Sequence, residues 1–332
     1  TLDAKTLDGR LNIITGKKGT GKSHLSKLLV LSLIDSRAPC IVLDVNGEYI
    51  NLSKTKPNSP KLQRRVVVLT PGVNMKLTLP QIGLRTVLGV LLFALDLPGN
   101  SARVFSGIWR QLQERNELTL SSLGAAIQRW DCHESVRDAM ISRYNTMIES
   151  GIFTDDQSEA SDLERIAGQL SEGGALIINM KNQFSTIRRM TVEILLSKLI
   201  DLLTSWKLRA VFLFAEEAHL YLRETYWEDI ITRMRHLGIF TTFITNQPDT
   251  IRESIYRQAD NIFLFNFVNE NDLETVSKVA RIDGESVKLI ARDLPPHHCL
   301  IIGEAVNNFP IVVNVRSIDA ETMGETRFFF RD

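Results

Sequence analysis

Residues 16–23, which decide the fold, read Gly16-Lys17-Lys18-Gly19-Thr20-Gly21-Lys22-Ser23. They follow the apolar run 11–14 and precede a helix-like run at 25–34. A complete G-x-x-x-x-G-K-S pattern between a strand signal and a helix signal predicts a P-loop. Its glycines let the backbone curl so that successive N–H groups point at phosphate oxygens, and the following helix adds the positive end of its dipole. The alternative, a chance glycine-rich turn, does not explain why the complete pattern lies in this context.

The P-loop predicts which residues hold a nucleoside triphosphate. We expect Lys22 to reach the β- and γ-phosphates and the hydroxyl of Ser23 to hold Mg²⁺. The full set of predicted nucleotide-binding residues is Gly16, Lys17, Lys18, Gly19, Thr20, Gly21, Lys22, Ser23 and His24. The remaining question is which kind of nucleotide-dependent machine the chain forms.

Length and charge limit the class of protein. The 332 residues, 44% of them hydrophobic, suffice for one large α/β domain with an insertion or for two domains. The 39 Lys and Arg against 39 Asp and Glu give a net charge of 0, so the chain lacks the overall positive field of a protein that coats DNA. A ring that grips DNA through a few pore loops needs no such field.

The cysteines and the apolar runs indicate the compartment. The cysteines, Cys40, Cys132 and Cys299, lack C-x-x-C spacing, which argues against a disulfide framework and a zinc site and favours a reducing cytoplasm. The most apolar segment, residues 87–95, is much shorter than the roughly 20 residues that span a bilayer. We also expect no signal peptide. These features predict a cytoplasmic protein without a membrane partner.

Short apolar runs alternate with helical periodicity along most of the chain. Alternation of this kind predicts an α/β fold with a doubly wound, mostly parallel sheet. Between residues 79 and 170 the strand pattern stops and the periodicity is helical, which predicts a helical-bundle insertion. The strands are expected at residues 11–14, 40–44, 66–69, 175–178, 211–214, 239–245, 261–267, 300–302 and 311–315.

Polar side chains follow two of these strands. The segment Glu216-Glu217-Ala218-His219 follows the fifth predicted strand, and Gln247 follows the sixth. In an open parallel sheet, ligands bind at the carboxyl ends of the strands. Hydrolysis needs a carboxylate near Mg²⁺ and a group that orients and deprotonates water, so we assign Glu216 to the metal and Glu217 to the general base. Gln247 is placed to contact the γ-phosphate or the attacking water. The alternatives are a solvated helix start for the glutamates and a turn residue for Gln247.

These motifs occur in an order that resembles the HerA branch of the HerA/FtsK superfamily. Two of them discriminate among P-loop families: the D-x-x-G-E-Y segment, Asp44-Val45-Asn46-Gly47-Glu48-Tyr49, and the E-E-A-H segment at 216–219. The P-loop, the helical insertion and Gln247-Pro248 complete a match over nearly the whole chain. The resemblance implies a RecA-like core, assembly into a homohexameric ring, and ATP hydrolysis at the subunit interfaces. For HerA proper it also implies translocation along double-stranded DNA with a partner nuclease.

We divide the chain into a RecA-like ATPase core at 1–78 and 172–318, the helical insertion at 79–171, and a tail at 319–332. The sequence departs from the HerA pattern in two places. HerA proteins usually carry an N-terminal β-barrel that binds the partner, and the barrel is absent here. Because the chain starts at Thr1, we expect that an N-terminal piece is missing. The tail is too short for a long C-terminal bracing helix.

A ring ATPase of this kind completes its site with an arginine from the next subunit, which stabilises charge on the transferred phosphoryl group. The resemblance favours Arg235, with Arg233 as the second candidate, and a solvated helix face is the alternative. Asp44 is expected as a metal-side residue, and Glu48 is expected near the metal or the subunit boundary. A tight turn would explain Asp44 and Glu48 equally well.

Contacts with DNA are the least defined part of the prediction. A pore loop needs a few cations, since phosphate contacts hold a duplex without reading its sequence. The first candidates are Lys181, Arg188 and Arg189, and the second are Lys54, Lys56 and the basic segment 61–65. Solvated faces are the alternative. The adjacent His297 and His298 are not expected to hold a metal, because neighbouring residues on a strand point to opposite faces.

Three other functions share parts of this pattern. A ring ATPase of a secretion or conjugation channel, or a regulatory ATPase scaffold in an antiviral effector complex, would use the same catalytic residues. A partner or a membrane association would distinguish these two from a DNA translocase. A GTPase switch would use residues 44–47 as D-x-x-G and residues 246–249 as the guanine-reading motif. Gln247 stands where that motif has lysine and the two glutamates would have no role, so this fit is poor.

Overall fold

The computed structural model describes residues 4–54, 65–221, 235–279 and 283–321. The chain forms two compact units. The first unit comprises Thr1–Val68, Ala167–Lys181 and Trp206–Asp332, and the second comprises Leu69–Ile166 and Asn182–Ser205. The domain boundaries given above stay a prediction, because compactness does not show which part folds by itself.

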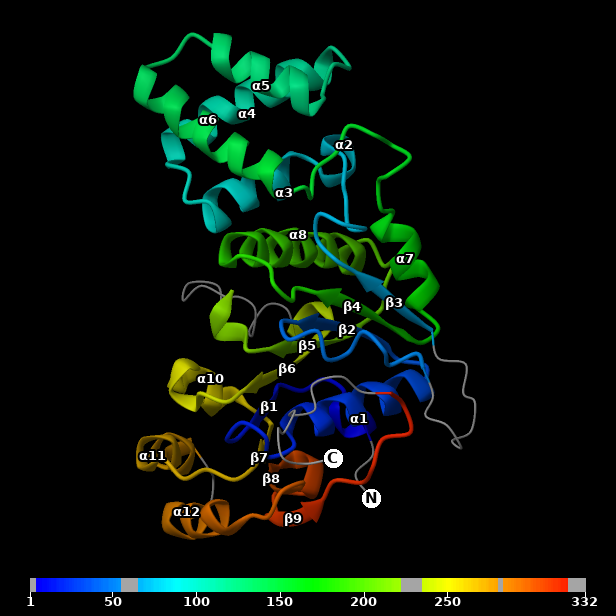
Figure 1. The fold of residues 1–332 in the computed structure, drawn as a ribbon, viewed down its shortest axis with the longest axis vertical. Helices are drawn as coiled ribbons and strands as arrows, with labels where there is room; N and C mark the ends of the chain where they lie inside the picture. Colours follow the sequence, from blue (N-terminus) through cyan, green and yellow to red (C-terminus); the bar gives the residue numbers. More distant parts are fainter. Residues whose placement is uncertain (1–3, 55–64, 222–234, 280–282, 322–332) are drawn as a thin grey trace, which may run out of the picture. The chain divides into compact units, whose positions relative to one another are not determined.

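A sheet forms the centre of the first unit, and its strand order in the described part of the chain is β3-β4-β2-β5-β6-β1-β7-β8-β9 (Figure 1). Strands β1, β2, β4, β5, β6 and β7 pair in parallel, whereas β8 is antiparallel to β7, and β9 to β8. The predicted α/β class with a mostly parallel sheet is therefore confirmed. The strands are β1 (Asn12–Thr15), β2 (Pro39–Asp44), β3 (Val66–Leu69), β4 (Gly174–Asn179), β5 (Val211–Glu216), β6 (Ile239–Thr245), β7 (Asn261–Leu264), β8 (His298–Gly303) and β9 (Ile311–Asn314).

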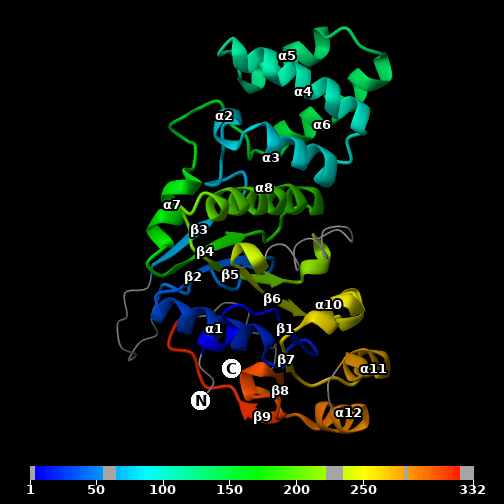
Figure 2. The ribbon, with the colours of Figure 1, turned by 180° about the vertical axis from the view of Figure 1, so that it is seen from behind.

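The central strands are continuously apolar because both faces of the sheet are covered. Helix α1 (Lys22–Asp35) packs against β1, β2, β4 and β6 (Figure 2). Its Leu29 and Leu33 belong to the same core cluster as Val42, Ile177 and Phe214 of the strands. Each fully buried Leu or Phe of this kind contributes about 1.5–3 kcal/mol relative to an exposed side chain. The helix that follows the P-loop therefore packs on the apolar core of the unit.

Two cysteines lie in this core. Cys40 of β2 and Cys299 of β8 are buried, and burial raises the pKa of the Cys299 thiol to about 12. Burial likewise raises the pKa of Cys40 far above its usual range. Cys132, in the second unit, is partly exposed.

The strand order places β6 between β1, which leads into the P-loop, and β5, which ends in Glu216. The register aligns Thr15 with Thr245 and Glu216 with Ile244. Because parallel strands end at the same edge of a sheet, the P-loop, the two glutamates and Gln247 start from neighbouring positions. This edge of the sheet carries the candidate site.

The C-terminal part of the first unit contacts the P-loop. Its short helices α10 (Glu253–Gln258), α11 (Glu270–Val279) and α12 (Gly284–Asp293) precede the antiparallel strands β8 and β9. The predicted strand at 261–267 ends at Leu264, but the backbone stays bonded to β1 and the P-loop. Phe265 N–H donates to the Thr15 carbonyl at 2.8 Å, and Lys17 N–H donates to the Asn266 carbonyl at 2.8 Å.

The second unit is helical in its described residues, as predicted for 79–170. Trp109, 1% exposed, packs in its core with Phe105 and Ile108. Its elements are α2 (Leu79–Ile82), α3 (Leu84–Gly89), a π-helical turn (Val90–Ala94), α4 (Gly99–Glu114), α5 (Leu120–Arg129), α6 (Glu134–Glu149) and α8 (Ser185–Thr204), and α7 (Leu163–Leu170) spans the unit boundary. No helix in the described part of the chain is long and apolar enough to cross a bilayer.

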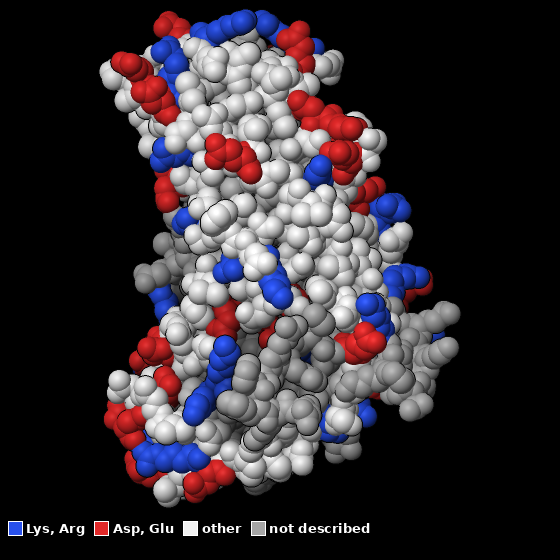
Figure 3. Space-filling view, in the orientation of Figure 1, with Lys and Arg blue, Asp and Glu red and all other residues white. Residues whose placement is uncertain are grey.

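Charged side chains are mixed over the surface. On the face drawn in Figure 3, Lys and Arg alternate with Asp and Glu within each unit, and no large area of one sign is visible among the described residues. Positive and negative side chains, which are equal in number in the sequence, are thus also intermixed on this face.

Candidate nucleotide-binding and hydrolytic site

The P-loop needs glycine at two positions because other segments pass directly beneath it. A side chain at Gly16 would collide with Phe265. Gly21 has a φ of 118°, and a Cβ there would lie 3.2 Å from both the ring of Phe265 and Nδ1 of His297. Only glycine combines this backbone conformation with so close an approach. The loop is therefore fixed by the segments that follow β7 and precede β8.

Lys22 lies inside the loop, with only 7% of its surface exposed. Its Nζ donates to the Lys17 carbonyl at 3.0 Å, and the Thr20 hydroxyl donates to the same carbonyl at 2.7 Å. Burial lowers the pKa of Lys22 to about 8, and the charges of Glu217, Glu216 and Glu48 oppose that shift. A phosphate oxygen would be a stronger partner for this ammonium group than one neutral carbonyl, because charge-assisted hydrogen bonds are about twice as strong.

Glu216 is buried at the end of β5, with 1% of its surface exposed. Its Oε1 lies 2.7 Å from the Tyr49 hydroxyl, while its buried Oε2 has no hydrogen-bond partner among the described residues. Burial, reinforced by the charges of Asp44 and Glu48, raises the pKa of Glu216 to about 8. An unpartnered buried oxygen of this kind is costly. A hard cation with oxygen ligands, such as Mg²⁺, would satisfy it together with the Ser23 hydroxyl, so this donor set fits the predicted ion.

Asp44 holds the turn that follows β2. Its carboxylate accepts backbone N–H bonds from Gly47, Glu48 and Tyr49 at 2.7, 3.0 and 2.9 Å. Burial raises the pKa of Asp44, and these three N–H bonds oppose the shift. The turn alternative thus describes the observed contacts of Asp44. Its place beside the metal stays a prediction.

The same turn carries two side chains that reach α1. Glu48 pairs with Lys27 of α1 at 2.9 Å. The buried Tyr49 hydroxyl lies 2.9 Å from Ser26 Oγ of α1 and 2.7 Å from Glu216. A hydroxyl has one proton, and a Glu216 carboxylate that holds a cation would be ionised and could only accept. Tyr49 would then donate to Glu216 and accept from Ser26. Tyr49 therefore connects the P-loop helix to the Glu216 side chain, a contact that the sequence motif alone did not reveal.

Replacing Tyr49 with Phe removes this hydroxyl and keeps the buried ring. A hydrogen bond to a charged group contributes about 1.5–3 kcal/mol, so we expect about a 10- to 100-fold loss of ATP turnover. The Mg²⁺ concentration for half-maximal turnover should rise as well. Tyr144→Phe is the matched control, because that hydroxyl donates to the Leu120 carbonyl in the second unit. An unchanged Mg²⁺ dependence in Tyr49→Phe would show that the hydroxyl does not position Glu216.

Glu217 has a left-handed backbone, with φ 46° and ψ 47°, which is uncommon for a residue other than glycine. Its N–H donates to the Ile244 carbonyl at 2.7 Å, which anchors it to β6. The Thr245 hydroxyl donates to Oε2 of its carboxylate at 3.4 Å, and Nδ1 of His219 lies 3.6 Å from the same oxygen. Backbone strain of this kind persists where the surrounding structure holds it, often at functional sites. The carboxylate is thus held at the end of β6.

Gln247 is exposed directly after β6. Its N–H donates to the Thr245 hydroxyl at 3.0 Å, so Thr245 contacts both Gln247 and Glu217. Thr245 is not among the predicted site residues, because a threonine inside an apolar strand gives no signal of this role. Gln247 also lines an open pocket of about 310 Å³, whose other lining residues are Lys17, Lys18, Asn246, Phe267, Val268, Asn269 and Asp272.

The first arginine candidate, Arg235, does not lie at this edge. Arg235 pairs with Asp260 at 3.2 Å, and Asp260 also accepts the N–H of Leu11 at 2.8 Å. Asp260 and Leu11 precede β7 and β1, so Arg235 lies at the amino-terminal edge of the sheet, opposite the P-loop. Arg233 lies outside the described residues.

The predicted DNA-contacting cations are spread over both units. Lys181 is exposed after β4, where its aliphatic chain covers Gly47. Arg188 and Arg189 are half-buried on α8 of the second unit. Lys54 is exposed, whereas Lys56 and residues 61–64 lie outside the described residues. A role of these cations in binding DNA stays a prediction.

These features define a P-loop NTPase fold of the RecA-like class. The P-loop follows β1, the paired glutamates lie at the end of β5, and β6 lies between these two strands. Residues 1–216 match the family "Helicase HerA, central domain", and the chain belongs to this family. The resemblance seen in the sequence is confirmed. No curated protein sequence matches the chain.

Solved structures share the fold over nearly the whole chain. VirB4 of Thermoanaerobacter pseudethanolicus has a TM-score of 0.70 at 13% identity, covering 93% of this chain and 90% of VirB4. The bacterial conjugative coupling protein TrwB, in complex with sulphate, has a TM-score of 0.65 at 14% identity, covering 94% of this chain and 86% of TrwB. TrwB in complex with the ATP analogue ADPNP has a TM-score of 0.64 at 14% identity, with the same coverage. At these identities the likeness shows the fold alone, and it confirms the predicted RecA-like core.

Proposed function

We propose that the protein is an ATP-hydrolysing motor of the HerA type, which assembles into a homohexameric ring and moves double-stranded DNA. Its partner would be a nuclease or another effector protein. The observation that carries this proposal is the convergence of Lys22, Glu216, Glu217 and Gln247 at one edge of a RecA-like sheet, in a chain of the HerA family. A structural P-loop protein without hydrolysis would not need a strained, carboxylate-bearing residue at that edge.

Each residue has a defined part in the reaction. Lys22 and the loop N–H groups bind the phosphates, and Ser23 and Glu216 would hold Mg²⁺, which neutralises charge on the β- and γ-phosphates when bound. Water attacks the γ-phosphorus, the bond to the β–γ bridging oxygen breaks, and the proton of the water passes to Glu217. Thr245 contacts the carboxylate of Glu217, and Gln247 orients the water. ADP and phosphate are the products.

Arg235 would act on the site of the next subunit. In a ring built by head-to-tail contacts, one face of each subunit meets a different face of its neighbour. The amino-terminal edge of the sheet, which carries Arg235, is opposite the edge that carries the P-loop. Such an arrangement would bring an arginine of one copy to the phosphates bound by another. The ion pair with Asp260 would then break as Arg235 turns to the phosphates.

A mixing experiment tests this assignment. Arg235→Ala and Lys22→Ala subunits should each be inactive, and a random equal mixture should regain about one quarter of wild-type turnover. The gain is expected because about one interface in four joins an intact P-loop to an intact arginine. Recovery is measured as ATP turnover at constant total protein. No recovery in particles shown to contain both subunits would rule out Arg235 as the arginine supplied in trans.

The ion pair with Asp260 provides the control. Asp260→Asn keeps an acceptor for the Leu11 N–H but removes the charge that Arg235 contacts. If Arg235 only stabilises its own chain, this variant should lose as much activity as Arg235→Ala. If Arg235 acts in trans, Asp260→Asn should keep most of its turnover.

The motor function is tested by measuring how DNA changes the rate of ATP turnover. We expect ATP turnover to rise with blunt double-stranded DNA more than with single-stranded DNA, and the stimulation to fall with added salt because phosphate contacts release counterions. Particle mass with ATP analogue and DNA measures the expected six-fold ring. A ring that hydrolyses ATP but neither binds nor responds to DNA would contradict the translocase. It would favour a protein-transport ATPase or a regulatory scaffold, which co-purification with its partner would identify.

A further inference from the structure

Two stretches of the C-terminal part lie against the start of α1, and we call residues 295–298 and 314–317 the strap. The His297 N–H donates to the Thr20 carbonyl of the P-loop at 2.9 Å, and the Val315 N–H donates to the His297 carbonyl at 2.8 Å. His24 Nε2 lies 2.9 Å from the Arg316 carbonyl. Each stretch of the strap is thus tied to the phosphate loop or to the first turn of its helix.

His297 is the residue of the strap nearest the loop. Its ring meets that of His24 edge to face, with centroids 5.1 Å apart and an interplanar angle of 71°. Its Nδ1 is one of the atoms that leave no room for a side chain at Gly21. The backbone φ of His297 is 61°, and the residue is exposed. A planar ring on a residue with a positive φ therefore lies beside the phosphate cradle, and the residue is accessible to solvent.

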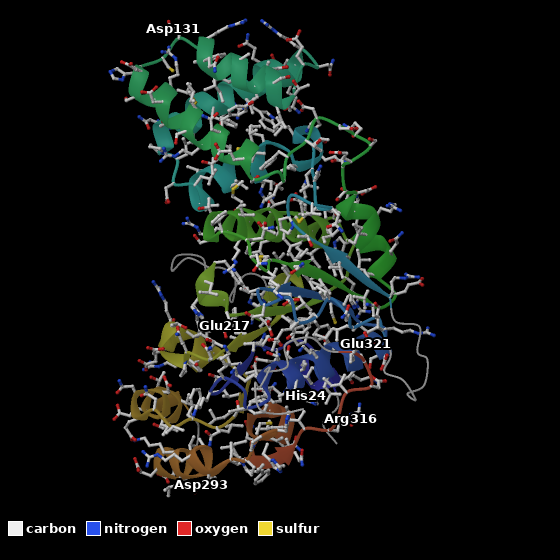
Figure 4. All side chains as sticks on the ribbon, viewed as in Figure 1. His24, Asp131, Glu217, Asp293, Arg316 and Glu321 are labelled. Carbon is white, nitrogen blue, oxygen red and sulfur yellow. The ribbon has the colours of Figure 1, made fainter. Side chains whose placement is uncertain are left out.

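The loop gives the bound nucleotide a direction. Lys22, which reaches the β- and γ-phosphates of a P-loop ligand, lies at the edge of the sheet where β5 ends in Glu216, so the γ-phosphate end lies toward the carboxylates. The loop N–H groups and the first turn of α1 then hold the α-phosphate. The nucleoside must leave the loop on the side of His24. Figure 4 shows Glu217 apart from His24 and Arg316, which lie together.

We propose that the strap is the nucleoside-binding part of the site, where the base packs on the planar side chains of His297 and Arg316. The proposal rests on the nucleotide binding proposed above and names the residues that receive the base. Bases stack on histidine rings and arginine guanidinium planes. Arg316 is exposed and forms no ion pair with another described side chain, so its guanidinium plane is accessible to a ligand.

The chemistry of this surface also sets base selectivity. Stacking uses the π-face that every base has and does not read its hydrogen-bonding edge. The stacking surface therefore does not distinguish adenine from guanine, and ATP and GTP should bind within about tenfold of one another. The strap acts on the base alone, whereas Lys22 acts on the phosphates.

The experiment compares two ligands with Mg²⁺ present: a non-hydrolysable ATP analogue and inorganic tripolyphosphate, which lacks the nucleoside. His297→Asn removes the ring and suits a positive φ, since Asn adopts this conformation more readily than most residues. His297→Asn and Arg316→Ala should each lower the affinity for the ATP analogue about 5- to 100-fold. Each should change the affinity for tripolyphosphate less than twofold. His297→Phe, which keeps a planar ring, should bind the analogue within about threefold of wild type. Arg257→Ala, an exposed arginine paired with Glu253, is the control.

The outcomes separate this proposal from the function on which it rests. A wild-type chain that binds neither ligand would contradict nucleotide binding altogether. A wild-type chain that binds both, with both strap variants binding the analogue normally, would overturn the nucleoside site. Equal losses for the analogue and for tripolyphosphate would also overturn it, because the strap would then act only by supporting the loop. Arg316→Ala, which leaves the backbone at Gly21 untouched, gives an independent result if His297→Asn is unstable.

Discussion

The Glu217→Gln variant should turn over ATP about 10²- to 10⁴-fold more slowly than wild type, because general base catalysis contributes about this factor. Glutamine keeps the size of the side chain and a hydrogen-bond acceptor for Thr245 but cannot take the proton of the attacking water. Binding of an ATP analogue should stay within about twofold, because Glu217 is not assigned to the phosphates. Steady-state turnover and calorimetric binding measure the two quantities separately.

Glu253→Gln is the control for this substitution, because Glu253 pairs only with Arg257 on the exposed face of α10 among the described residues. If the folded Glu217→Gln variant turns over ATP within threefold of wild type, Glu217 is not the general base. A loss of analogue binding as large as the loss of turnover would instead mean that Glu217 supports the nucleotide.

The Lys22→Ala variant is expected to lose both binding and hydrolysis. Charge-assisted hydrogen bonds contribute about 1.5–3 kcal/mol, so affinity for ATP analogue and for tripolyphosphate should each fall about 10- to 100-fold. Turnover should fall by about a further 10²-fold, because Lys22 would also stabilise charge that develops on the transferred phosphoryl group. Calorimetry with both ligands and saturating-ATP turnover are the measurements.

Removing Lys22 should not unfold the protein. Burial of its ammonium group is unfavourable in the free protein, as its lowered pKa shows. Lys22→Met, which fills the same space without charge, should therefore match Lys22→Ala in activity and wild type in thermal stability. Lys288→Ala on α12 is the control for loss of a lysine. Normal analogue affinity in either Lys22 variant would contradict the P-loop assignment.

The P-loop and the paired glutamates could be predicted because their chemistry lies in a few consecutive residues. Glycines and lysine at fixed spacing, followed by a helix, specify a phosphate cradle locally. The alternation of apolar runs likewise predicted the class of fold. The position of β6 between β1 and β5 was not predictable, because strand order depends on long-range packing that periodicity does not encode.

The remaining site residues become visible only in three dimensions. Asp44 and Tyr49 lie five residues apart, yet the first closes a turn and the second reaches Glu216, 167 positions away. The ion pair of Arg235 with Asp260 also depends on which loops meet at one edge of the sheet. From the sequence, His297 and His298 are expected together on one strand. The structure separates them: His297 has a positive φ before β8 and packs on the P-loop, while His298 begins the strand.

The burial of two of the three cysteines has a practical consequence for spectroscopy. Cys40 and Cys299 are inaccessible in the core, and their raised pKa values keep them as unreactive thiols at neutral pH. Cys132 in the second unit is partly exposed, so a maleimide dye should label the native chain at this one thiol without any substitution. Energy transfer between that dye and a fluorescent nucleotide bound at the P-loop would then test whether the distance between Cys132 and the nucleotide changes during hydrolysis.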